Sequence, residues 1–147
     1  IWCEGLGGRL LELDCADGRT RGDLPAPNAT GVSVSPDGAS LAVATGGSQV
    51  PVWDLGTRRL RLTLRGHRNA VVSVSCTPNG RRLATAGVDG TMRLWDSGSG
   101  LQTLAVPVEI RYVWRLVVSP DGAWIATAGG TYESGPEPGD VRLWLAR

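Results

Sequence analysis

The sequence contains no phenylalanine and no lysine, only one histidine and only three cysteines. Cys3, Cys15 and Cys76 form no Cys-x-x-Cys pair, and their odd number and irregular spacing argue against a disulfide scaffold or a zinc site. We therefore expect no metal and a reducing, cytoplasmic setting. No apolar run approaches the length of a membrane span, so we expect no membrane-spanning helix and no membrane partner.

Neither sign of charge dominates. The fifteen basic residues, all arginine, nearly balance fourteen acidic ones, and the net charge of +1 indicates no class of partner. Hydrophobic residues make up 41% and charged residues 20%, which is typical of a folded domain and not of a disordered segment. A chain of 147 residues can form one domain with its own core.

A turn signal recurs at a fixed period. Ser-Pro-Asp-Gly at 35–38 returns as Thr-Pro-Asn-Gly at 77–80 and as Ser-Pro-Asp-Gly at 119–122, so that the three prolines lie 42 residues apart. Trp53-Asp54 returns as Trp95-Asp96, again 42 residues later. A repeat of this period indicates a stack of similar small structural units.

Tryptophan marks the same place in further units. The tryptophan motif recurs as Leu-Trp-Leu at 143–145, near the end of the third unit. A weaker copy of the motif, Ile-Trp at 1–2, begins the chain. The second unit has four short strand signals, at 70–75, 83–86, 91–95 and 101–104. Turns with Asn79-Gly80, with Asp89-Gly90 and with the polar residues 96–100 separate them, and no helical period occurs. We expect an all-β fold of four-stranded antiparallel sheets.

The order of these motifs resembles the WD-repeat family of β-propellers. The second unit carries the whole pattern, with Gly66-His67, Thr85, Asp89-Gly90 and Trp95-Asp96. The resemblance implies propeller blades that serve as a non-catalytic scaffold for binding other proteins or peptides. It implies no cofactor, and nucleic acid is not an expected partner. No glycine-rich loop leads from a strand into a helix, so a nucleotide site has no support either.

The resemblance also implies a structural role for four residues of the second unit. They are expected to form a hydrogen-bonded chain that runs through Trp95, Thr85, His67 and Asp89. The alternative is that His67 acts with Asp89 as a general base. We favour the structural role, because the repeat explains the spacing and no nucleophile accompanies the pair. We therefore expect no enzyme activity.

The other units depart from this pattern. In the first unit the histidine, threonine and aspartate positions are held by Pro25, Val43 and Gly47. The third unit keeps Thr127 and Trp144 but has Glu109 at the histidine position, and its loop near 129–139 is seven residues longer. We expect the second blade to be the most rigid of the three.

The expected organisation is one WD-repeat segment over 1–147. Its parts are the end of a preceding blade at 1–14, blades at 27–66 and 67–106, and a blade without its last strand at 109–147. About three blades cannot close a ring, since propellers have about four to eight. We expect a piece of a longer propeller, as the start at Ile1 also suggests. Copies of this chain that together complete one ring are the alternative.

Two surfaces are candidates for binding. Aromatic and charged residues of the third unit form an expected partner-binding site, which consists of Tyr112, Trp114, Arg115, Tyr132 and Glu133. The alternative is that Tyr112 packs against the next blade. Arginines at 58, 59, 61, 65 and 68 either form a basic stripe or guard a sheet edge, and we favour the guard. A sensor or recruitment module of a larger regulatory protein, such as a kinase or nucleotide-dependent switch, is the alternative function.

Overall fold

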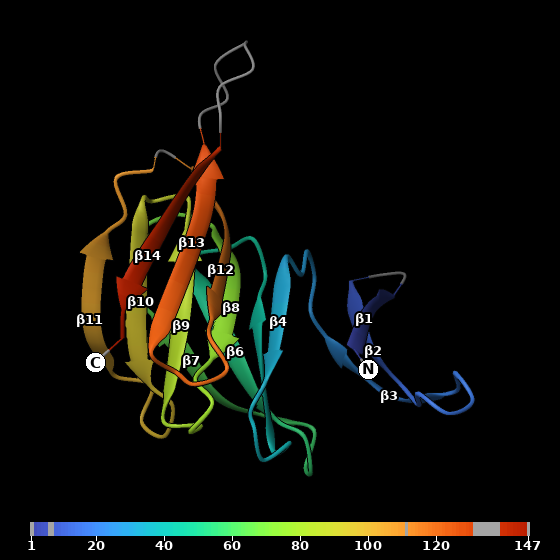
Figure 1. The fold of residues 1–147 in the computed structure, drawn as a ribbon. Coiled ribbons are helices and arrows are strands. Elements are labelled where there is room, and N and C mark those ends of the chain that lie inside the picture. The colour runs from blue at the N-terminus through green and yellow to red at the C-terminus, as the bar shows by residue number, and fades with distance from the viewer. Residues whose placement is uncertain (1, 6–7, 111, 131–138, 147) are drawn as a thin grey trace.

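The computed structural model describes residues 2–5, 8–110, 112–130 and 139–146. Within these residues the chain forms fourteen strands and no helix. Figure 1 shows how the strands are arranged. All strand pairs are antiparallel, and neighbours in sequence are neighbours in each sheet. The expected all-β fold is therefore confirmed.

Four sheets follow one another along the chain. The first has three strands: β1 (Trp2–Gly5), β2 (Arg9–Leu13) and β3 (Thr20–Pro25). The second has four: β4 (Gly31–Val34), β5 (Ser40–Ala44), β6 (Gln49–Asp54) and β7 (Arg59–Arg65). The third has β8 (Val71–Cys76), β9 (Arg82–Gly87), β10 (Thr91–Asp96) and β11 (Gln102–Pro107). The fourth has β12 (Tyr112–Val118), β13 (Trp124–Gly130) and β14 (Asp140–Leu145).

The turn repeat has a local cause. Gly38, Gly80 and Gly122 all have φ near +70°, a conformation that glycine adopts without steric cost. The residue before each glycine, for example Asn79, accepts a hydrogen bond from the backbone amide two positions on. This is the Asx turn that aspartate and asparagine favour, so the 42-residue period reflects the same hairpin in three sheets.

The first sheet extends further than the sequence suggested. The pattern placed the end of the preceding blade at 1–14 and read Trp2 as a third-strand tryptophan, but the sheet continues through β3 to Pro25. The pairing register shifts just before Leu13, as it does just before Trp53 and Trp95. Leu13 therefore holds the tryptophan position, and Trp2 lies one strand earlier. The substitution of leucine for tryptophan concealed this blade.

Successive sheets pack face to face. Val50 and Val52 of the second sheet share a buried cluster with Val74 and Leu83 of the third. A second cluster joins the third and fourth sheets, and a third joins the first and second. Each interior sheet thus buries apolar side chains on both faces, which alternation along a strand allows.

The innermost strands are also tied by side-chain hydrogen bonds. The Ser73 hydroxyl accepts from the backbone amide of Leu116 at 3.0 Å and donates to its carbonyl at 3.2 Å. One interface earlier, Thr30 donates to the carbonyl of Val71 at 3.0 Å. These bonds satisfy backbone groups in a buried layer, where an unmet group is costly. Over the described ranges there is no helix that has the length and apolarity needed to cross a membrane.

Candidate functional site

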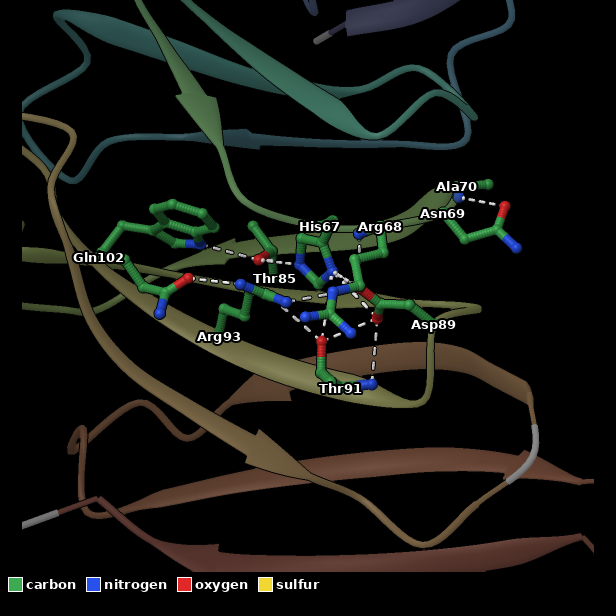
Figure 2. Close-up of polar contacts among 10 residues, drawn as sticks. His67, Arg68, Asn69, Ala70, Thr85, Asp89, Thr91, Arg93 and Gln102 are labelled. Atoms are coloured by element: carbon green, nitrogen blue, oxygen red, sulfur yellow. Dashed lines mark hydrogen bonds and ion pairs between the residues drawn. The ribbon is translucent and has the colours of Figure 1, made fainter.

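The third sheet contains a continuous polar chain in its interior (Figure 2). The indole N–H of Trp95 on β10 donates to Thr85 Oγ1 at 2.8 Å. Thr85 on β9 lies 2.8 Å from His67 Nε2, and His67 Nδ1 lies 3.0 Å from Asp89 Oδ2. The structure thus brings together the four residues that the resemblance singled out.

The directions of the hydrogen bonds fix the tautomer of His67. Thr85 accepts from Trp95, so its hydroxyl proton is free to go to Nε2 of His67. Nδ1 then carries the ring proton and donates it to the Asp89 carboxylate. Burial lowers the pKa of His67, and the nearby charge of Asp89 offsets only part of that effect. The imidazole is therefore neutral at pH 7.

The Asp89 carboxylate is held from several sides. It accepts from the Arg68 amide at 2.9 Å and from the Thr91 hydroxyl at 2.7 Å, and Arg93 lies 3.7 Å away. Burial acts to raise the pKa of Asp89, but these hydrogen bonds and His67 lower it overall. Sequence reasoning missed Arg68, Thr91 and Arg93. Thr91 was the easiest of the three to predict from the sequence, since a hydroxyl two residues after an aspartate often hydrogen-bonds to its carboxylate in a turn.

The geometry does not favour His67 as a general base. Its side chain is 1% exposed, and both ring nitrogens have partners. A β-carbon on Gly87 would lie 2.9 Å from Nδ1, so the backbone closes over the ring as well. A substrate could not reach a base enclosed in this way. The network can orient and stiffen the sheet.

A family model agrees with this arrangement. The model described as "WD domain, G-beta repeat" matches residues 58–96, which include all four members of the network. This match, over part of the chain, and the fold support a WD-repeat β-propeller. Its sheets are therefore blades, and the network is the polar centre of the blade formed by the third sheet. WD40 repeats in general mediate contacts between proteins.

The fold of this WD-repeat chain has a solved counterpart. It is similar to hydrazine synthase from Kuenenia stuttgartiensis, with a TM-score of 0.84 and 17% sequence identity. The likeness covers 95% of this chain but only 40% of that one, and identity at this level is evidence of the fold alone. The comparison with curated proteins gave no match. In the described part of the chain, no cluster of histidine, cysteine and acidic residues could hold a metal ion.

From here on the blades are numbered by their sheets, so that the second blade is β4–β7 and corresponds to the first unit of the sequence repeat; it lacks the network. Val43 stands where the third blade has Thr85, because Leu41 pairs with Trp53 as Leu83 pairs with Trp95. The indole nitrogen of Trp53 is buried and has no hydrogen-bond partner. An unmet buried donor reduces the stability of this blade, and the greater rigidity of the blade at 67–106 stays a prediction.

The fourth blade keeps half of the network. Trp144 donates to Thr127 Oγ1 at 3.1 Å, as Trp95 does to Thr85. Glu109, at the histidine position, has φ of +51° and pairs with Arg142 at 3.1 Å. In this blade an exposed ion pair stands in place of the histidine and aspartate half of the network.

The structure describes three of the five expected partner-binding residues. Tyr112 is half-buried at the start of β12, while Trp114 is 48% exposed and Arg115 is exposed. A β-carbon on Gly130 would lie 2.9 Å from the Trp114 ring, so the indole lies over that glycine. Tyr132 and Glu133 lie outside the described residues.

A wider apolar face surrounds Trp114 on the outer side of the fourth blade. Cross-strand pairs place Trp124 beside Leu145, and they place Ala126 between Val117 and Leu143. The five larger side chains of this face are exposed: Val117, Trp124, Val141, Leu143 and Leu145. Alternation along β14 does not by itself show which side chains are exposed, because that depends on the layer next to the strand.

The arginine group lies mostly at an edge. Arg59, Arg61 and Arg65 are exposed on β7, the outermost strand of the second blade. Arg58 instead forms an ion pair with Glu12 of the first blade. Charge along an outer strand discourages pairing with foreign strands, which fits the guarding role.

Proposed function

We propose that this chain is a non-catalytic scaffold that binds a protein partner through the outer face of its fourth blade. The observation that carries the proposal is the row of exposed apolar side chains around Trp114 and Trp124. Contiguous apolar surface rimmed by polar residues is typical of protein interaction sites. Tryptophan and arginine are the residues most often found at the centre of such sites, which supports roles for Trp114 and Arg115.

The equivalent face of the third blade is a packed contact. In the third blade Met92 and Leu94 hold the positions of Val141 and Leu143, and both are buried against the fourth blade. Side chains of this kind at these positions are therefore suited to a packed contact. The fourth blade differs from the third in the two tryptophans on its outer face.

The enclosed network supports the non-catalytic part of the proposal, since the sole histidine is already committed to Thr85 and Asp89. The thiol of Cys76, which forms no disulfide, suits the proposed cytoplasmic setting. The alternative of a sensor or recruitment module in a larger regulatory protein stays a prediction, because no observation on these residues favours it.

Site-specific crosslinking tests the proposal. A photoreactive residue replaces Val117, which is on the face, or Leu60, which has similar exposure on β7. We expect one protein to crosslink at position 117 and not at 60. The purified partner should then bind Trp114→Ala at least tenfold more weakly than the original chain. The same crosslinks at both positions, or equal affinity for a folded Trp114→Ala variant, would reject the proposal.

A further inference from the structure

The hairpin turn of the third blade differs in charge from the turns of the two blades beside it. The turns at 35–38 and 119–122 contain an aspartate, and an alanine follows the glycine of each. In the turn at 77–80 an asparagine takes the place of the aspartate, and Arg81 and Arg82 follow the glycine. The same hairpin is therefore acidic in two blades and basic in the blade between them.

The hydrogen bonds of the turn do not require the arginine side chains. Asn79 Oδ1 accepts from the backbone amide of Arg81 at 3.0 Å, as Asp37 does from Ala39 in the second blade. The backbone carbonyl of Arg81 accepts from the Ser97 amide at 3.0 Å, and Ala39 has the same type of bond. Only the backbone of residue 81 takes part, so alanine would serve equally well there. The bonds instead hold the two arginines on a fixed backbone.

Both guanidinium groups are open to a partner. Arg81 and Arg82 are exposed, and neither forms an ion pair with a described residue, in contrast to the exposed Arg9. Asp96 is the cross-strand neighbour of Arg82, but its carboxylate accepts from the amide and the hydroxyl of Ser99. The positive charge of the turn is thus not used to stabilise the blade through an ion pair.

Two grooves border the basic turn. One of about 510 Å³ lies toward the second blade, where Pro36, Pro78 and Arg81 line it. The other of about 550 Å³ lies toward the fourth blade, and Arg81 and Arg82 line it together with the apolar Leu94. Both volumes are in the range of ligand-binding pockets. The first groove lies between two blades that each have four strands. Arg81 lines both grooves, so a segment that lies across the turn meets both arginines.

Carboxylates flank the arginines on either side. Asp37 and Asp96 line the first groove, and Asp121 lines the second. Hydrogen bonds from side chains and amides of their own turns lower the pKa of all three, so these groups are negative at pH 7. A long polyanion such as a nucleic acid would meet these negative charges, whereas a short acidic cluster centred on the turn would meet the arginines. The order of charges therefore favours a short cluster.

We propose that Arg81 and Arg82 bind a short acidic cluster in a segment of a partner protein, which lies across the turn between the two grooves. A guanidinium group can donate two parallel hydrogen bonds to one carboxylate, which gives geometric specificity as well as attraction. The fixed backbone of the turn lowers the entropic cost of binding. This surface is distinct from the outer face of the fourth blade, and the proposal does not depend on that contact.

The test uses a capped synthetic peptide with a central pair of glutamates in an otherwise uncharged sequence of serine, proline and leucine. The control peptide has glutamines in place of the glutamates. We expect the glutamate peptide to shift the side-chain NMR signals of Arg81 and Arg82, and to leave those of the exposed Arg59 and Arg65 on β7 in place. The glutamine peptide should shift none of them.

Matched variants separate the turn from net charge. Arg81→Ala with Arg82→Ser gives this turn the residues that the second blade has, and should weaken binding of the glutamate peptide by about tenfold or more. Arg59→Ala with Arg65→Ala removes the same charge from β7 and should leave the affinity unchanged. Asn79→Asp adds the carboxylate of the other turns and should weaken binding by about threefold. If the double variant of the turn fails to fold, Arg81→Gln replaces it.

Three results would overturn the proposal. Equal weakening by the turn and β7 variants would show an effect of net charge alone. Equal binding of the glutamine peptide would show that carboxylates are not recognised. Tighter binding of a single-stranded oligonucleotide through the same arginines would assign the turn to a nucleic acid. Trp114→Ala should leave peptide binding unchanged, which distinguishes this surface from the proposed scaffold contact.

Discussion

The indole N–H of Trp95 donates to the Thr85 hydroxyl over 2.8 Å, and neither side chain meets solvent. This bond begins a relay that ends at a carboxylate held by backbone and side-chain donors. Its members come from a loop, two strands and a turn, so the bond joins parts of the chain that local interactions leave independent. Buried relays of this kind rigidify a fold only when each member has its partner.

Replacing Thr85 by valine should therefore be costly. The change keeps the shape but leaves the Trp95 indole and Nε2 of His67 without a partner, and we expect a loss of about 2–5 kcal/mol of unfolding free energy. Urea unfolding followed by tryptophan fluorescence measures it. The matched change Thr127→Val removes one bond, at a partly buried tryptophan, and should cost about 1 kcal/mol. Equal losses in the two variants would contradict a special role for the relay.

The second blade should gain from the opposite change. Val43→Thr places a hydroxyl where Thr85 stands in the third blade, and the unpartnered indole nitrogen of Trp53 then has an acceptor. We expect a gain of about 1 kcal/mol, the usual net value of one internal hydrogen bond. The same urea titration measures the gain, with Val43→Ala as the control for lost packing. A threonine variant that is as unstable as the alanine variant would show that the acceptor is not reached.

The histidine should make stability depend on pH in a defined window. Burial lowers the pKa of folded His67 below its ordinary value of 6.5, so between these two values the unfolded chain binds a proton that the folded chain does not. Stability should therefore fall as the pH drops below 6.5, by at most about 1.4 kcal/mol per pH unit. Below the folded pKa this contribution no longer changes.

Thermal unfolding at several pH values measures the effect, and the single histidine gives one unambiguous NMR titration. The control is His67→Gln, which should remove the dependence in this window. Asp89, whose pKa is lowered, contributes separately below its ordinary value of 3.8. An NMR pKa above 6.5 for His67 would contradict the argument.

Gly129 should be irreplaceable for a steric reason. A β-carbon there would overlap the backbone carbonyl oxygen of Tyr112, which cannot move without breaking the pairing of β12 with β13. Gly129→Ala should destabilise the protein by about 3 kcal/mol or more, because overpacking against backbone is poorly relieved. Gly47→Ala is the control, since its nearest contact is a side-chain oxygen at 3.7 Å. Similar melting temperatures for the two variants would reject this reasoning.

Sequence reasoning failed where one residue replaced another at a repeated position. Leu13 holds the place of a tryptophan, and the first blade was therefore assigned to the wrong residues until the backbone register showed the correspondence. The same reasoning selected Trp114 because aromatic and charged residues occur together in that part of the sequence. It did not identify the exposed apolar face around Trp114. Whether a strand residue faces solvent or a neighbouring blade depends on the layer next to it, which no local pattern contains.

The sequence by itself determined the blades, because turns and strand alternation are set by interactions within a few residues. Asn79 and Gly80, for example, specify the same hairpin turn as Asp37 with Gly38 and Asp121 with Gly122. Through its resemblance to the WD-repeat family it also indicated the members of the polar relay. Only the tertiary structure decided that Trp53 lacks an acceptor and that Val141 and Leu143 are exposed. These properties arise where one sheet meets, or does not meet, the next, and packing between distant segments is a property of the assembled fold.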